Sequence, residues 1–223
     1  MAQSDDRRPL SSRDTGWARA IARRLSATGI TPNQISMASM AMAAVAGAAF
    51  WFAGSASSGS RIALLLAAAL FCQLRLLCNL FDGMVAIEGG KQAADGPFWN
   101  EFPDRVADIL ILAGVGYGIG VPALGWAAAA LAVLTAYTRE LGRNCGLPAD
   151  FSGRMAKQHR MATITAAALL SLLEPSWHGQ THVLTVALWL IAVGAAVTAL
   201  RRAVNIVRGL RARVGRQAGL RAR

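Results

Sequence analysis

Long runs of apolar residues dominate the chain, and short polar segments separate them. A bilayer core about 30 Å thick requires roughly 20 apolar residues per helix, at a rise of about 1.5 Å per residue. Six runs approach this length and are predicted to be membrane spans: approximately 35–54, 62–81, 106–123, 124–141, 161–174 and 183–200. The fifth run is short, so we expect it to need tilt or flanking residues to cross the bilayer.

Strands are not expected, because no stretch alternates apolar and polar residues with a period of two. The sequence therefore predicts an all-α fold, a polytopic membrane helical bundle of about six transmembrane helices. We divide it into an N-terminal segment (1–27), a six-helix membrane domain (28–205) and a basic tail (206–223). The composition is 54% hydrophobic and rich in Ala, Leu, Val and Ile, which agrees with helices that face lipid.

Basic residues fall on one side of the predicted membrane. The chain has 23 Lys and Arg, and of these only Arg61 lies in a predicted outer loop. The positive-inside rule then predicts a multi-pass protein of the cell membrane, with both termini and the candidate site in the cytoplasm. With this distribution, the net charge of +11 indicates anionic membrane lipids as partners and argues against nucleic acid.

The N-terminal segment carries an amphipathic pattern. Trp17, Ile21 and Leu25 recur at intervals of four, and arginines stand between them. This pattern predicts a helix that lies on the membrane surface beside the first span. The tail from Arg201 to Arg223 carries eight Arg and is expected to contact the same headgroups. Residues 1–16 are polar and charged, and they lack the apolar run of a secretory signal peptide.

Acidic residues are concentrated near the end of the second predicted helix and the start of the third. The chain has twelve Asp and Glu, and six lie within 27 residues: Asp82, Glu88, Asp95, Glu101, Asp104 and Asp108. Carboxylates at membrane helix ends require pairing, hydration or a bound cation. We assign Glu88, Asp95 and Glu101 to a hydrated loop or to ion pairs. The three others we interpret as ligands of a hard divalent cation beside phosphates.

Helical spacing groups these acids with other polar residues. Asn79, Asp82 and Ala86 are three and four residues apart, so they share one face of the second helix. The third helix opens with a stack of residues spaced four apart: Asn100, Asp104 and Asp108. Two polar helix faces at one membrane boundary therefore predict a single site.

Basic residues on the same side of the membrane complete this candidate site. Arg139 ends the fourth span, and Lys157 and Arg160 precede the fifth. Such side chains are suited to a substrate that carries phosphate. Anchoring to the membrane surface is the alternative role for all three, and the sequence leaves both open.

These residues resemble the signature of the CDP-alcohol phosphatidyltransferases. That signature reads Asp-x-x-Asp-Gly-x-x-Ala-Arg, then eight residues, Gly, three residues, Asp, three residues and Asp. Here the first part reads Asn79-Leu-Phe-Asp82-Gly83-Met-Val-Ala86-Ile87, and Gly96 stands at the expected interval. The segments TPNQIS, RELGRN and GRMAKQHRMATITAA also resemble the family, so the resemblance extends from about residue 28 to 205.

The chain departs from this signature at Asn79, Ile87 and Asn100, which stand for Asp, Arg and Asp. Strict spacing makes Asn100 and Asp104 the last pair. A second register uses Asp104 and Asp108 instead, because family members often carry Asp-Pro-Val-Ala-Asp there. It needs four extra residues, about one helical turn. We prefer the second register because it retains three of the four acids.

The resemblance implies an enzyme that displaces CMP from a CDP-activated lipid or alcohol and forms a phospholipid. It implies that Asn79, Asp82 and Asp104, with Asp108, form a Mg²⁺ or Mn²⁺ site, and that Asp108 is the general base. The charge lost at Asn79 argues against a second metal. The substrate-binding residues that it implies are Gly83, Ala86, Gly96, Asn100, Arg139, Lys157 and Arg160.

Two other classes of function compete with this interpretation. A catalytically weakened relative would bind lipid or nucleotide without turnover. A cation transporter would use the carboxylates as a relay, but these lie at helix ends and not at the midplane, where transporter sites are found. The acceptor alcohol, the lipid or small-alcohol nature of the donor and a homodimeric assembly are left open by the sequence.

Overall fold

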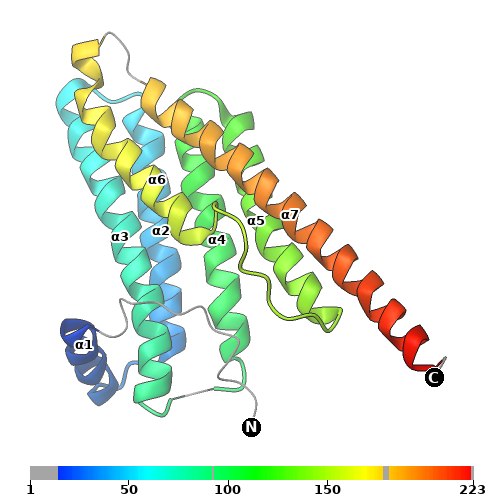
Figure 1. The fold of residues 1–223 in the computed structure, drawn as a ribbon. Helices are drawn as coiled ribbons and strands as arrows, with labels where there is room; N and C mark the ends of the chain where they lie inside the picture. The colour runs from blue at the N-terminus through cyan, green and yellow to red at the C-terminus, as the bar shows by residue number, and fades with distance from the viewer. Residues whose placement is uncertain (1–14, 92, 178–180, 222–223) are drawn as a thin grey trace.

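The structure is a computed structural model that describes residues 15–91, 93–177 and 181–221, and within these ranges it is helical without strands. Its elements are α1 (Gly16–Ala27), α2 (Pro32–Ala53), α3 (Ser58–Glu88), α4 (Gly96–Gly118), α5 (Pro122–Asn144), α6 (Lys157–Leu170), the 3-10 helix η2 (Ser171–Trp177) and α7 (His182–Arg221). Helices α2 to α7 run alternately up and down the bundle, and α1 lies beside the lower end of α3 (Figure 1). The predicted all-α bundle with an N-terminal helix is confirmed.

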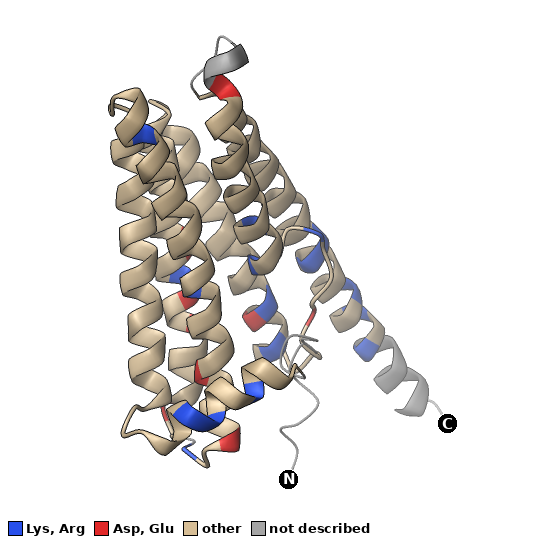
Figure 2. Ribbon diagram, turned by 90° about the vertical axis from the view of Figure 1, so that its left-hand side faces the viewer, with Lys and Arg blue, Asp and Glu red and all other residues tan. Residues whose placement is uncertain are grey.

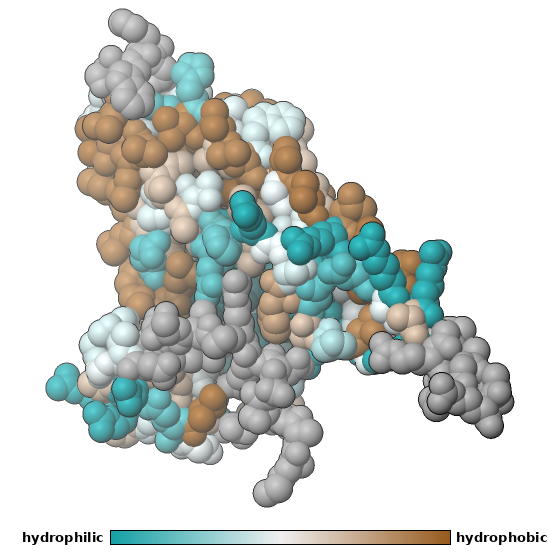
Figure 3. Space-filling view, viewed as in Figure 1, coloured by the Kyte–Doolittle hydropathy of each residue, from teal (hydrophilic) through white to brown (hydrophobic). Residues whose placement is uncertain are grey.

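On the face shown in Figure 3, apolar residues cover much of the upper part of the bundle. On α7, Val186, Leu190, Val193 and Val197 are each more than half exposed and recur every three or four residues. Soluble proteins seldom expose a continuous apolar face of this kind, so this face is suited to lipid. The protein is a membrane protein.

In the part of the chain that the structure describes, three helices contain a stretch long and apolar enough to cross a bilayer: Pro32–Ala53, Ser58–Glu88 and His182–Arg213. The other predicted spans correspond to α4, α5 and α6. Helices α4 and α5 have 23 residues each, which is long enough to cross a bilayer. Neither contains a stretch as apolar as those of the three helices above. Helix α6 has 14 residues and continues into η2, as expected for the shortest predicted span.

Local sequence signals set the start of α2. The Thr31 hydroxyl accepts a hydrogen bond from the Gln34 amide at 3.2 Å, and the Gln34 side chain accepts one from the Thr31 amide at 3.0 Å. This capping box satisfies two amides that would otherwise lack partners. Pro32 occupies the first turn, where no amide hydrogen is needed.

The loop before α4 is bound to the start of α2. Trp99 Nε1 and Asn33 Nδ2 both donate to the carboxylate of Asp95, at 2.9 and 3.0 Å. These hydrogen bonds favour the charged form and lower the pKa of Asp95. Lys91 Nζ donates to the carbonyl of Thr28 at 2.7 Å. The α3–α4 loop is therefore held against the α1–α2 loop and the start of α2.

Glycines allow α2 and α4 to approach at backbone distance. A Cβ atom on Gly47 would lie 2.3 Å from the Leu110 carbonyl oxygen, and one on Gly114 would lie 2.2 Å from the Gly47 oxygen. Small residues at such crossings are typical of membrane helices, whose association depends on close packing. This contact fixes the position of α4, which carries Asn100, Asp104 and Asp108 of the candidate site.

Replacing Gly47 by Val is expected to separate α2 from α4. Overpacking typically costs about 1–3 kcal/mol, and more where only backbone could move. We expect a lower melting temperature in detergent and a smaller folded yield from membranes. Gly59→Val is the matched control, because a Cβ at Gly59 meets nothing within 4 Å. Equal melting temperatures for the two variants would contradict the close packing.

Among the described residues, a buried ion pair lies at the end of the bundle away from the α3–α4 loop. Arg61 Nη2 lies 3.1 Å from Glu174 Oε2, and both side chains are almost fully buried. Glu174 also accepts a hydrogen bond from the Val183 amide at 2.7 Å. The single basic residue of the predicted outer loops is thus neutralised within the fold and joins α3 to η2.

Helices form in the basic regions at both ends of the chain. In α1, Ala18 and Ala22 are buried, whereas Trp17 and Ile21 are exposed at 50% and 38%, on the face predicted to contact the membrane surface. At the other end, α7 continues from the last predicted span to Arg221, within the predicted basic tail (206–223).

Candidate active site

Charged side chains gather at one end of the bundle, here named the polar end (Figure 2). It comprises the C-terminal ends of α3 and α5, the N-terminal ends of α4 and α6, and the α5–α6 loop (145–156). A cavity of about 200 Å³ opens there. Its charged lining residues are Glu101, Asp104, Arg105, Arg139, Arg143, Lys157, Arg160 and Arg202. Cations therefore outnumber carboxylates in the lining, which suits an anionic ligand.

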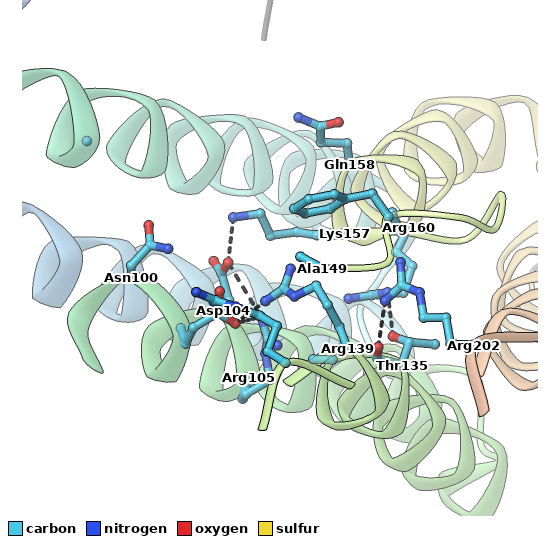
Figure 4. Close-up of a pocket in the computed structure, with 16 residues that line it drawn as sticks. Asn100, Asp104, Arg105, Thr135, Arg139, Ala149, Lys157, Gln158, Arg160 and Arg202 are labelled. Carbon is cyan, nitrogen blue, oxygen red and sulfur yellow. Dashed lines mark hydrogen bonds and ion pairs between the residues drawn. The ribbon is translucent and has the colours of Figure 1, made fainter. Parts of the chain in front are cut away.

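Asp104 is the most highly connected residue of this site (Figure 4). Its Oδ1 accepts hydrogen bonds from Arg75 at 2.9 Å and from Asn79 at 2.7 Å, both on α3. Its Oδ2 accepts one from Lys157 of α6 at 2.5 Å and lies 3.7 Å from Arg105 Nη2. The side chain is almost completely buried, and such a carboxylate requires these partners.

Arg75 lies behind Asp104, away from solvent. Its side chain is 0% exposed, and its Nη2 forms the ion pair with Asp104. The Nε and Nη1 atoms have no hydrogen-bond partner among the described residues. A buried guanidinium with unmade hydrogen bonds is costly, so the Asp104 carboxylate is the contact that retains it.

Asp82 lies close to the same cluster on α3. Its Oδ2 accepts a hydrogen bond from the Ser36 hydroxyl of α2 at 2.7 Å. The ammonium of Lys157 interacts electrostatically with both Asp82 and Asp104. Lys157 thus contacts Asp104 directly and attracts Asp82 electrostatically.

Asp108 occupies a separate position, one turn further along α4. It is fully buried, and its carboxylate pairs with Arg160 at 2.5 Å. Arg160 also donates to the Met155 carbonyl at 2.8 Å. We expected Asp104 and Asp108 to face Asp82 together. Instead, Asp108 does not line the cavity, because its carboxylate requires a countercharge and the guanidinium from α6 supplies it.

The contact between Asn79 and Asp104 sets the register of the two helices. Helices α3 and α4 are antiparallel. Asp82 lies about one turn closer to the polar end than Asn79, and Asn100 lies about one turn closer to it than Asp104. Asp82 and Asn100 are therefore at the same height in the bundle. Asn100 lines the cavity with Asp104. Helix α4 begins at Gly96 and continues without a bulge. The contact of Asn79 with Asp104 therefore favours strict spacing, and the register that the chemistry uses stays a prediction.

Arg139 and Arg202 form the wall of the cavity on α5 and α7. Arg139 pairs with Glu101 at 2.5 Å and with Glu140 at 2.9 Å, and lies 5.8 Å above the Phe151 ring. Arg202 Nη1 donates to the Thr135 carbonyl at 2.6 Å. The ion pair expected for Glu101 is thus present, and the cations are held in place by their neighbours.

The structure brings six predicted residues into the lining of one cavity: Gly83, Asn100, Asp104, Arg139, Lys157 and Arg160. Asn79 and Asp82 lie next to it through the contacts above. Ala86, Gly96 and Asp108 are not among the lining residues. Sequence reasoning missed Arg202, Thr135 and Phe151. Arg202 could have been found from its place at the polar end of the last span, but no pattern singled out the other two.

The donor chemistry of this cluster fits a hard divalent cation. Within the described ranges, no three His, Cys, Asp or Glu side chains converge as a metal site. The Asp104 carboxylate contacts the Asn79 side chain at 2.7 Å, and Asp82 follows Asn79 by three residues on α3. The ammonium of Lys157 lies 2.5 Å from Asp104 and also attracts Asp82, so the field of the two carboxylates favours positive charge there.

Two characterised proteins are similar in sequence. The chain is 30% identical over 143 residues to the phosphatidylinositol phosphate synthase of Streptomyces avermitilis, covering 60% of this chain and 59% of that protein. It is 32% identical over 152 residues to the bifunctional IPC transferase and DIPP synthase of Rubrobacter xylanophilus, covering 64% of this chain and 32% of that protein. The alignments thus span less than two thirds of either relative. No protein-family model matches the sequence.

Solved structures of Mycobacterium tuberculosis phosphatidylinositol phosphate synthase are similar in fold. The form with CDP-DAG bound superimposes with a TM-score of 0.68 at 22% identity, covering 85% of this chain and 92% of that one. The complex with manganese and citrate gives a TM-score of 0.71 at 20% identity, covering 85% and 88%. The chain therefore has the helical fold of this membrane enzyme.

Proposed function

We propose that this protein is a CDP-alcohol phosphatidyltransferase, which displaces CMP from a CDP-activated lipid and forms a phospholipid. The observation that carries the proposal is the cavity that Asp104 lines together with Arg139, Lys157 and Arg160, with Asp82 next to it. A carboxylate can accept a proton, and the cations can hold phosphates. The similarity to a phosphatidylinositol phosphate synthase and to a bifunctional IPC transferase and DIPP synthase supports the same class of reaction.

We propose Mg²⁺ or Mn²⁺ as the cofactor, held by Asp82, Asp104 and Asn79. Asn79 donates to Asp104 in the structure, so a rotation of its amide would present the oxygen to the ion. When bound, the metal neutralises charge on the diphosphate. The manganese complex of the M. tuberculosis enzyme supports this assignment.

The reaction requires a base, and the geometry favours Asp104. The acceptor hydroxyl oxygen forms a bond to the lipid-side phosphorus, the bond from that phosphorus to the bridging oxygen breaks, and CMP leaves with that oxygen. The hydroxyl proton passes to a carboxylate in contact with the acceptor. Asp104 lines the cavity, and the Lys157 that covers its Oδ2 is partly exposed, whereas Asp108 is covered by the buried Arg160. We therefore propose Asp104 as the base in place of Asp108: its Oδ1 faces Asn79 and would bind the metal, and its Oδ2 would accept the proton once Lys157 has moved to a phosphate. Asp108 positions Arg160.

The acceptor is proposed to carry a phosphate. Arg139, Lys157, Arg160 and Arg202 all line the cavity, a larger positive charge than the donor diphosphate alone requires. The similarity to phosphatidylinositol phosphate synthases supports an acceptor of this kind. We propose CDP-diacylglycerol as the donor, as found in the M. tuberculosis enzyme.

Purified protein with radiolabelled CDP-diacylglycerol and a panel of polyols, each with and without a phosphate group, tests this function. We expect labelled lipid only with phosphorylated acceptors. Product formation with a neutral polyol alone would contradict the acceptor assignment. Bound nucleotide without any product would favour the alternative, a relative that binds lipid or nucleotide without turnover.

We further propose that all six of α2 to α7 span the membrane, with the polar end and both termini in the cytoplasm. We propose that anionic lipids bind at α1 and at the end of α7. We also propose that the protein forms a homodimer. A single cysteine at Ser57, in a cysteine-free background, is expected to react with an impermeant reagent added outside intact cells. A cysteine at Ala149 should react only after permeabilisation. Outside labelling of position 149 would refute this orientation.

A further inference from the structure

The carboxylates of the proposed metal site already have countercharges within the chain. Asp104 contacts both Arg75 and Lys157, at 2.9 and 2.5 Å. The same ammonium also attracts Asp82. Asn79 stands where the family signature has a third carboxylate. Arg75 and Lys157 therefore offset the two negative charges of Asp104 and Asp82 before any metal binds, while Arg105, 3.7 Å from Asp104, is paired with Glu101 at 3.2 Å.

The two cations differ in how freely they can move. The Arg75 side chain is fully buried on α3, whereas the Lys157 side chain is 29% exposed at the cavity. Arg75 Nε and Nη1 already lack hydrogen-bond partners among the described residues. If the guanidinium left Asp104, its Nη2 would lose its partner as well. Arg75 is therefore a permanent countercharge, and Lys157 is one that a ligand can displace.

A divalent ion that entered this cluster alone would add two positive charges beside Arg75 and Lys157. The ion and these two cations would repel one another strongly, because burial limits the screening of their charges by solvent. The diphosphate of the donor carries the negative charge that would offset this excess. It also offers Lys157 a new partner at the cavity, so that Asp104 Oδ2 becomes available.

We propose that Arg75 and Lys157 act as built-in countercharges of Asp104, so that the divalent ion binds firmly only together with the nucleotide diphosphate. Arg75 is a positioning residue, which holds Asp104 through the cycle. Lys157 passes from Asp104 to a phosphate when the donor binds. This inference rests on the proposed function, and it adds an order of binding that the metal site alone does not require.

Equilibrium dialysis of Mn²⁺ against the purified full-length protein, with and without CDP, tests the proposal. A chamber with CDP and no protein corrects for Mn²⁺ bound by the nucleotide in solution. For the unmodified protein we expect CDP to tighten Mn²⁺ binding by a factor within the roughly 5–150-fold range of coupled sites. Reciprocally, Mn²⁺ should tighten CDP binding by the same factor.

Lys157→Gln and Arg75→Gln are the informative variants, and Arg208→Gln on exposed α7 surface is the matched control. Each of the first two should bind Mn²⁺ more tightly without CDP and show weaker coupling, while the control stays unchanged. Lys157 is partly exposed, so its variant tests the proposal even if Arg75→Gln unfolds.

Tight Mn²⁺ binding by the unmodified protein without CDP, unaffected by Lys157→Gln, would overturn the countercharge proposal and leave the proposed function intact. Absence of Mn²⁺ binding both with and without CDP would refute the metal site and with it this inference. Strong coupling that Lys157→Gln does not reduce would overturn the role of Lys157.

Discussion

Asp104→Asn is expected to reduce turnover by a factor of roughly 10²–10⁴ or more, the range for loss of a general base. The amide keeps the shape of the side chain and its contact with Asn79 but cannot accept the acceptor proton. Asp108→Asn should affect turnover much less. Because it loosens Arg160, it should mainly raise the KM for the anionic acceptor. Both rates are to be measured at saturating metal and donor.

A charge-balanced control separates chemistry from folding. Asp104→Asn leaves Arg75 buried without a countercharge, which can cost about 3–5 kcal/mol of stability. The double variant Asp104→Asn with Arg75→Gln removes both charges and should recover the melting temperature without recovering turnover. If Asp104→Asn turns over normally while Asp108→Asn is inactive, the base is Asp108 and the second register is correct.

Removing divalent metal is expected to abolish turnover altogether. With excess EDTA, the diphosphate retains its charge and Lys157 remains on Asp104, so the leaving CMP is not stabilised. Mg²⁺ or Mn²⁺ should restore the rate, whereas Ca²⁺, which is larger and adopts a looser geometry, should restore it poorly. Undiminished turnover in excess EDTA would contradict the metal site.

Asn79→Asp tests the same site from the opposite direction. The new carboxylate would stand 2.7 Å from Asp104 and repel it unless a cation lies between them. We expect Mn²⁺ to bind more tightly to this variant. Unchanged or weaker affinity would show that residue 79 is not a ligand.

The sequence predicted the bundle because its main determinants are local. Apolar runs define the helices, and a spacing of three or four places Asn79 and Asp82 on one face of α3 without knowledge of any neighbour. The same reasoning found Asp104, Lys157 and Arg160, which the structure brings to one cavity or its edge.

The pairing of these residues could not be predicted, because it depends on the relative height of neighbouring helices. A slip of one turn exchanges Asp104 for Asp108, and the sequence carried signals for both registers. The contact of Asn79 with Asp104 favours strict spacing. The partner of Asp108, Arg160, lies 52 residues away, so no local pattern indicates that this pair forms.

The stoichiometry of CMP released to phospholipid formed, by purified protein in lipid nanodiscs, tests the central claim most directly. Labelled CDP-diacylglycerol and a phosphorylated polyol are supplied with Mg²⁺, and Asp82→Ala serves as the inactive control. We predict one CMP per labelled phospholipid for the unmodified protein and neither product for the variant. CMP release without a lipid product, or equal rates for both proteins, would contradict the assignment of this cavity as a phosphotransferase site.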